Sequence, residues 1–295
     1  MKTRALLSFG IATLLAFTSL HGAAALPRLF PDIAPGFHVG DPEARNPIAS
    51  TEGPKTLAAG DLNGDGIDDV IAGNLDGSIS ILVGRTNNTF LDQILVPATG
   101  LLSNSSLRSV VRGDFNGDGK LDIVVGDIAR AGVVVLLGGG NGTLLPFSRT
   151  PVGPVRAMAV ADFNHDNKLD LLVACSPPDC EWCFGANAIQ DTNRFLCILR
   201  GNGDGTFGAP QYLLTPGTSA CFYDVDASDL NGDGHPDATA LDSGICFPTG
   251  TLVVRSRRIQ IFANDGNGGF ATNAPSRVLE SAGEGPRAFQ VTYID

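Results

Sequence analysis

With 37 Gly and 18 Pro among 295 residues and only 7% aromatic residues, the chain has the composition of a turn-rich β protein, which argues against a helical fold. Its formal net charge of −11, without a basic stripe, argues against nucleic acid as a partner. The composition therefore predicts strands and turns in which acidic side chains carry the chemistry.

Residues 1–25 are predicted to be a cleavable secretory signal. Lys2 and Arg4 precede an apolar stretch over residues 5–20, and small residues at 23–25 place the cleavage near Ala25. The stretch is shorter than the roughly 20 residues that span a membrane, so an uncleaved anchor is the weaker alternative and no transmembrane segment is expected. The protein is thus expected to be secreted, at the cell surface or periplasmic. Residues 26–50, with five prolines, are expected to form an irregular lead-in to a domain at 51–295.

A nine-residue acidic loop then recurs four times, beginning at residues 61, 114, 162 and 229, and its first copy reads Asp61-Leu-Asn-Gly-Asp-Gly-Ile-Asp-Asp69. Side-chain oxygens at positions 1, 3, 5 and 9 and the carbonyl of position 7 match the roughly six to eight oxygen ligands of Ca²⁺. Position 6, where such a loop turns sharply, holds glycine in three copies and Asn167 in the third. The sequence predicts about four structural calcium ions. The predicted ligands are Asp61, Asn63, Asp65, Ile67, Asp69, Asp114, Asn116, Asp118, Lys120, Asp122, Asp162, Asn164, Asp166, Lys168, Asp170, Asp229, Asn231, Asp233, His235 and Asp237.

These loops are not EF-hands. An EF-hand needs a bidentate Glu at position 12 and flanking helices, but position 12 holds Ala72, Val125, Val173 and Ala240. The same absence argues against a dockerin-like helical pair. Each loop is followed by a short apolar run that predicts a mostly buried strand, so the loop is expected to join two strands. The alternative for each loop is an Asx-rich turn without metal, and it is stronger for the third copy, where His165 and Asn167 replace glycines.

Four strands are predicted in the first repeat, at about residues 56–60, 69–73, 78–84 and 90–97. A second recurring element, with a Gly/Asn turn, spans residues 136–143, 199–207 and 262–270, and in the last two copies it ends in Phe. The spacings between the loops along the sequence are near or above the length of a propeller blade. A repeat of this kind cannot bury its own sheet, so the repeats are expected to stack.

With these loops and turns, the chain resembles the FG-GAP or VCBS repeats that build the N-terminal β-propeller of integrin α subunits and occur in many secreted bacterial proteins. The resemblance covers roughly residues 55–295. It implies an all-β β-propeller of four-stranded blades with calcium-binding loops, comprising four full repeats and the start of a fifth. The last stretch, residues 285–295, aligns with the strands that precede the first and third loops, which would make Asp295 the opening ligand of a fifth loop.

This alignment suggests the N-terminal part of a longer propeller; the alternative is a small propeller closed by the N-terminal segment. If the ring stays open, an exposed sheet edge is expected to favour self-association.

The third and fourth repeats carry insertions at residues 176–193 and 241–258. The chain's six cysteines, Cys175, Cys180, Cys183, Cys197, Cys221 and Cys246, lie in these two repeats. An even number in a secreted chain favours disulfides, although six cysteines allow many pairings and the sequence does not choose among them. A redox role for Cys180-Glu-Trp-Cys183 and a zinc site remain weaker alternatives.

The favoured function is a calcium-rigidified binding or adhesion module that meets an extracellular protein or glycan through its loops and insertions, and it is not expected to be an enzyme. The alternative is a propeller-scaffold hydrolase or lyase acting on polysaccharide or phosphodiester. Outside the loops no acid/base pair stands out. Arg112-Gly-Asp114 spells an integrin-binding tripeptide, but Asp114 is expected to point into its loop.

Overall fold

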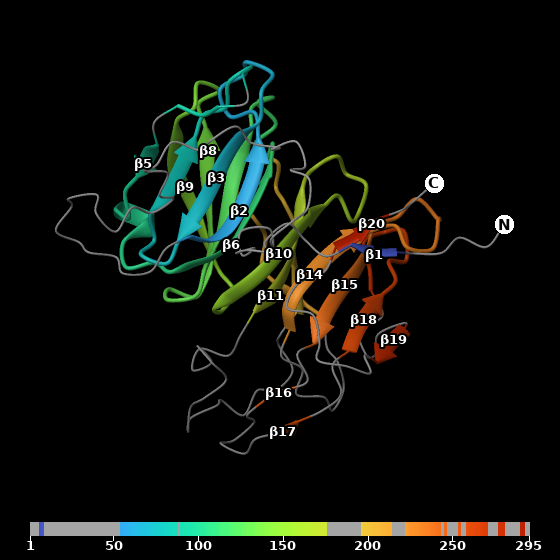
Figure 1. Ribbon diagram of the computed structural model, residues 1–295. Helices are drawn as coiled ribbons and strands as arrows, with labels where there is room; N and C mark the ends of the chain where they lie inside the picture. Colours follow the sequence, from blue (N-terminus) through green and yellow to red (C-terminus); the bar gives the residue numbers. More distant parts are fainter. Residues whose placement is uncertain are drawn as a thin grey trace, which may run out of the picture.

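The computed structural model describes residues 6–8, 54–87, 89–91, 93–175, 196–213, 222–242, 245–246, 253–254, 258–270, 277–280 and 290–292. Within these ranges the protein is all-β, and its strands form antiparallel sheets that follow one another along the chain (Figure 1). The predicted lead-in, the insertion at 176–193, and Cys180, Cys183, Cys221 and Asp295 lie outside the described residues.

Four sheets each contain four strands in chain order, so consecutive strands are hydrogen-bonded neighbours. The first consists of β2 (Pro54–Gly60), β3 (Asp69–Asn74), β4 (Ile79–Leu82) and β5 (Ile94–Val96), and the second of β6 (Leu107–Gly113), β7 (Asp122–Asp127), β8 (Gly132–Gly138) and β9 (Leu144–Pro151). The third consists of β10 (Val155–Ala161), β11 (Asp170–Cys175), β12 (Leu196–Leu199) and β13 (Gln211–Tyr212), and the fourth of β14 (Phe222–Ser228), β15 (Asp237–Asp242), β18 (Arg258–Phe262) and β19 (Arg277–Glu280). The four strands predicted for the first repeat are confirmed, although β5 is shorter than expected.

Five smaller elements complete the described structure. A short 3₁₀ turn, η2 (Gly100–Leu102), lies between the first two sheets in sequence, and β16 (Ile245–Cys246) pairs with β17 (Val253–Val254) inside the fourth repeat's insertion. β1 (Leu6–Ser8), within the predicted signal, pairs with β20 (Gln290–Thr292), within the predicted start of a fifth repeat. Within the described ranges, the structure holds no helix with the length and hydropathy of a membrane span.

The hydrophobic core lies between the sheets. On β7, Ile123 and Val125 pack in a cluster with the first sheet, whereas Val124 packs in a cluster with the third. Both faces of this strand are therefore buried, which is why the residues after each loop are apolar without alternation. Burial of each such side chain contributes about 1.5–3 kcal/mol, so the stacking of sheets stabilises the fold.

The first strands of successive sheets contact one another, β2 with β6, β6 with β10 and β10 with β14. Val110, Met158 and Val225 occupy equivalent positions on three of these strands and are 7%, 7% and 5% exposed, because each packs toward the preceding sheet. The equivalent Leu57 on β2 is 56% exposed. The β2 part of the first sheet's outer face is thus exposed, although Ala72 and Ser80 on the same face are buried. The described strands do not form the closed propeller that the resemblance implies.

Antiparallel order gives each four-stranded sheet two distinct ends. The connection from first to second strand and the turn from third to fourth strand lie at one end, which we call the loop end. The connection from second to third strand lies at the other, the insertion end, because both insertions occur at this step. Figure 1 shows β16 and β17 below β15 and β18, on the side of the molecule away from the loops that top the first sheet.

Candidate calcium loops

Each acidic loop connects the first and second strands of its sheet, as expected. The first begins directly after β2 ends at Gly60 and finishes where β3 starts at Asp69. Gly66 has φ +81°, a conformation that suits glycine, and the third loop adopts similar angles with His165 at +56° and Asn167 at +63°. The third loop thus keeps the turn at a cost in backbone strain, which falls mainly on His165.

Side-chain oxygens at positions 1, 3 and 5 accept hydrogen bonds from backbone amides of the same loop. Asp61 Oδ1 accepts a hydrogen bond from the Gly64 amide at 2.7 Å, and its Oδ2 accepts one from Gly66 at 2.7 Å. Asn63 Oδ1 accepts from the Asp65 amide at 2.9 Å. The second and fourth loops repeat these bonds, with Asp114 and Asp229 in the first position. Because Asp114 accepts bonds within its own loop, the Arg112-Gly-Asp114 tripeptide does not present a free carboxylate.

Backbone donors favour the ionised form of three of these carboxylates. The Gly66 amide lowers the pKa of Asp61, the Gly234 amide lowers that of Asp229, and the Lys120 amide lowers the pKa of Asp118. These loop residues are exposed or half-buried. The loops therefore offer anionic oxygens to solvent near neutral pH, a donor set that suits a hard cation such as Ca²⁺.

The aspartate of position 9 has a second role that the sequence did not indicate. Asp122 is fully buried; its Oδ2 accepts from the Phe115 amide at 3.0 Å and its Oδ1 from the Gly138 amide at 2.8 Å. Asp69, Asp170 and Asp237 make the equivalent pairs of bonds. Burial raises the pKa of Asp122 and of Asp170. This carboxylate anchors the loop to the turn between the third and fourth strands.

The donor types at positions 1, 3 and 5 are those that a calcium ion prefers, whereas position 9 is limited by its backbone bonds. Each carboxylate oxygen can accept more than one bond, so position 9 retains acceptor capacity. In the described part of the chain, no three His, Cys, Asp or Glu side chains are grouped around a common metal position. At position 7, the amides of Ile67, Lys120, Lys168 and His235 donate to the carboxylate of position 5.

The first three loops also contact the next sheet, through position 2 and the next sheet's turn. The Gly142 amide donates to Leu62 O at 3.1 Å, and the Gly205 amide donates to Phe115 O at 2.9 Å. The Phe115 ring also meets Phe207 edge-on, with centroids 5.8 Å apart. We call this contact between the second and third sheets the 2–3 junction. The recurring Phe of the turn was visible in the sequence, but its partner in the preceding repeat was not.

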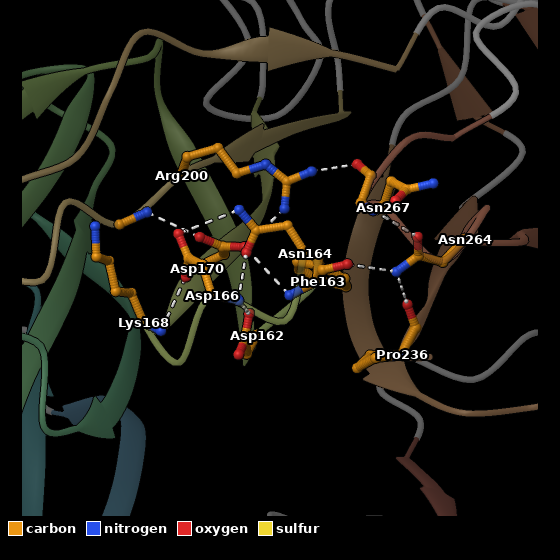
Figure 2. A network of polar contacts seen from close by, with 12 residues as sticks. Asp162, Phe163, Asn164, Asp166, Lys168, Asp170, Arg200, Pro236, Asn264 and Asn267 are labelled. Atoms are coloured by element: carbon orange, nitrogen blue, oxygen red, sulfur yellow. Dashed lines mark hydrogen bonds and ion pairs between the residues drawn. The ribbon is translucent and has the colours of Figure 1, made fainter. Parts of the chain in front are cut away.

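The contact between the third and fourth sheets, the 3–4 junction, uses more side chains (Figure 2). Phe163 meets Phe270 edge-on at 5.5 Å, and its carbonyl accepts from Asn264 Nδ2 at 2.8 Å in place of a glycine amide. Arg200 Nη1 lies 2.7 Å from Asp170 Oδ2, and its Nη2 donates to Gly268 O. The rings of His165 and His235, from neighbouring loops, lie 2.6 Å apart between Nε2 and Nδ1.

Two regions of the chain, residues 61–125 and 114–173, match the family of FG-GAP-like repeats. The matched regions contain the first three acidic loops. The chain contains FG-GAP-like repeats. The resemblance seen in the sequence is thereby confirmed for adjacent repeats, and each matched region runs from one acidic loop into the second strand of the next sheet.

Solved structures similar to this chain include a lectin and a biofilm matrix protein. One is an Agrocybe aegerita lectin with specific recognition of non-reducing terminal N-acetylglucosamine, which is 19% identical with a TM-score of 0.45, over 76% of this chain and 51% of the lectin chain. The other is the V. cholerae biofilm matrix protein Bap1, which is 16% identical with a TM-score of 0.40, over 77% of this chain and 28% of that chain. The chain thus spans about half of the first and less of the second. Comparison with curated proteins finds no match.

Proposed function

We propose that the protein is a secreted, calcium-stabilised binding module that attaches to an extracellular protein or glycan, with its calcium in a structural role and without catalysis of its own. The observation that carries this proposal is the repeated geometry of the loops. Each presents carboxylate oxygens to solvent at positions 1 and 5 and, in the first three sheets, contacts the next sheet directly through position 2.

In the second loop, Asp114, Asn116 and Asp118 would hold the cation, with the carbonyl of Lys120 and the remaining capacity of Asp122. The bound ion supplies positive charge among carboxylates that otherwise repel one another. Because Phe115, between the first two ligands, contacts the third sheet, a loop held in one conformation also holds the 2–3 junction.

The placement of the insertions supports different roles for the loop end and the insertion end of the sheets. Both insertions leave their sheets at the insertion end, away from the loops. Long insertions in repeat folds commonly form the binding surface. The insertion end, including the β16–β17 hairpin, is therefore proposed as the ligand-binding end, whereas the loop end is structural.

Thermal unfolding with millimolar CaCl₂ and with EDTA tests the calcium part of the proposal. A site at a hundredfold excess of ligand over Kd adds about 2.7 kcal/mol, so calcium is expected to raise Tm. Asp118→Ala should reduce the calcium-dependent rise. Asp204→Ala is the matched control, because Asp204 is an exposed turn carboxylate that accepts from Thr206 outside the loops. Equal melting curves with calcium and EDTA would refute the proposal.

A screen of glycans and matrix proteins tests the binding part. We expect a ligand that binds wild type and is lost when residues 245–254 are replaced by a short Gly/Ser connection, while Asp204→Ala binds normally. Retention of all ligands by the replacement variant would remove the hairpin from the binding surface. N-terminal sequencing of the exported protein tests cleavage near Ala25.

A further inference from the structure

Two cysteines of the third sheet lie in contact inside the core. Cys175 is the last residue of β11 and Cys197 lies on β12, and their Sγ atoms are 3.7 Å apart. They are 3% and 0% exposed and belong to the cluster between the second and third sheets. Cys197 pairs directly with Val173, so Cys175 is its diagonal neighbour on the same face of the sheet.

The same diagonal position is occupied by directly interacting side chains in two other sheets. In the first, Asn74 Nδ2 donates to Ser80 Oγ at 3.0 Å. In the fourth, Gln260 Nε2 donates to Asp242 Oδ2 at 3.5 Å. In these two sheets the repeat therefore brings the side chains of the two positions into contact. In the third sheet both residues are cysteine, which makes the pair suited to a covalent bond.

We propose that Cys175 and Cys197 form a disulfide that joins β11 to β12. The Sγ atoms need to approach by about 1.7 Å to reach the bond length of ~2.05 Å, a movement that rotation of the two side chains can supply. The two thiols lose two protons and two electrons in total. A disulfide-containing oxidant of the secretory route accepts them by thiol–disulfide exchange and is reduced to two thiols.

The bond forms before the sheets finish packing. In the folded protein, the hydrogen bond between the two thiols and the burial of Cys175 both raise the pKa of Cys175. The Cys175 thiol is therefore not present as the thiolate that exchange requires. The same burial protects the bond, once made, from external reductants. The disulfide also links the chain at the two ends of residues 176–195, which connect β11 to β12. An insertion proposed to bind ligand is thereby attached to a fixed base.

Peptide mapping of the exported wild-type protein tests the pairing. The protein is denatured without reductant, alkylated and digested, and the fragments are identified by mass spectrometry. We expect a fragment that joins Cys175 to Cys197 and is separated by reduction. Alkylation of either residue, or a bond from either to another cysteine, would overturn the proposal.

Two variants keep the test decisive if mapping is incomplete. A variant with Ser at positions 180, 183, 221 and 246 retains only this pair, and thiol titration after denaturation should find no free thiol; two free thiols per chain would contradict the bond. Cys175→Asn with Cys197→Ser introduces the Asn74 and Ser80 pair of the first sheet. It is expected to fold with an unchanged circular dichroism spectrum and to lose the linked fragment. If this variant still gives the linked fragment with the mass found in wild type, the fragment joins other cysteines and the assignment to Cys175 and Cys197 is wrong.

Discussion

The 2–3 and 3–4 junctions both join an acidic loop to the next sheet, but they use different side chains. At both, a phenylalanine at position 2 of the loop meets the phenylalanine of the next turn edge-on. The 2–3 junction adds a backbone hydrogen bond from Gly205, whereas the 3–4 junction adds Asn264, Arg200 and the histidine pair. The more polar junction joins the loop that has lost its glycines. The difference suggests that side-chain contacts between sheets offset the strain that His165 and Asn167 introduce.

The largest effect is expected where the junctions are alike. Phe115→Ala and Phe163→Ala each remove a buried ring, and each should lower the free energy of unfolding by about 3–5 kcal/mol. Double-mutant cycles with Phe207 and Phe270 should give couplings of about 0.5–1.5 kcal/mol at both junctions. Urea unfolding followed by circular dichroism measures these values. A coupling at one junction only would show that the ring pairs are not equivalent.

The two arginine-paired carboxylates differ in the direction of their pKa shifts. Burial alone would raise the pKa of Asp127, but donors from Ser106, Arg149 and Ser105 outweigh it, and the pKa lies below its ordinary value of 3.8. The pKa of Asp170, with fewer donors, is raised by burial despite Arg200.

Asp127 is therefore expected to stabilise the fold above pH 3.8, and this contribution is lost as the pH falls through its lower folded pKa. Asp127→Asn should cost about 3 kcal/mol at pH 7, and the difference from wild type should shrink as the pH falls below 3.8. Urea unfolding across this range provides the measurement. A difference that stays constant or grows on acidification would contradict the assigned sign.

Arg200 is a clear difference between the two junctions, because the 2–3 junction has a leucine in its place. Its position in the second sheet is held by Leu137, so Arg200→Leu gives the 3–4 junction the residue used at the preceding repeat. The change removes hydrogen bonds to Asp170 and Gly268 and should cost about 2 kcal/mol, because Asp170 keeps its backbone donors. Leu137→Ala, which leaves the 3–4 junction intact, is the control for lost packing. An Arg200→Leu variant as stable as wild type would mean that the pair is energetically neutral.

The smallest effect concerns the third loop. His165→Gly restores the residue of the other loops and should relieve about 1 kcal/mol of strain while losing the contact with His235. The net change in unfolding free energy should therefore be slight in wild type. In a His235→Lys background, which copies Lys168 of the third loop, the same change should stabilise by nearly the full amount. Destabilisation in both backgrounds would show that His165 is not strained.

The parts of the fold that depend on local chemistry could be predicted from the sequence. The oxygen pattern and turn residues of each loop lie within nine residues, and the apolar runs after Asp69 and Asp122 mark strands buried on both faces. The calcium assignment itself stays a prediction.

What the sequence could not show depends on contacts between repeats. The sequence predicts position 9 only as a calcium ligand, because the backbone amides that bind its carboxylate are distant in sequence. Gly138, which donates to Asp122, lies 16 residues away. The pairing of Phe115 with Phe207 appears only when sheets stack. Closure of the ring depends on what covers Leu57, which no local pattern encodes.

The most direct test of the account is the amount of calcium bound per chain. Equilibrium dialysis of the exported protein, followed by elemental analysis, should find about four ions for wild type and for Asp204→Ala. Asp118→Ala should bind one ion fewer. Protein that binds no calcium at millimolar concentration, or an Asp118→Ala variant that binds as much as wild type, would contradict the claim that the loops hold calcium and stabilise the packing of the sheets.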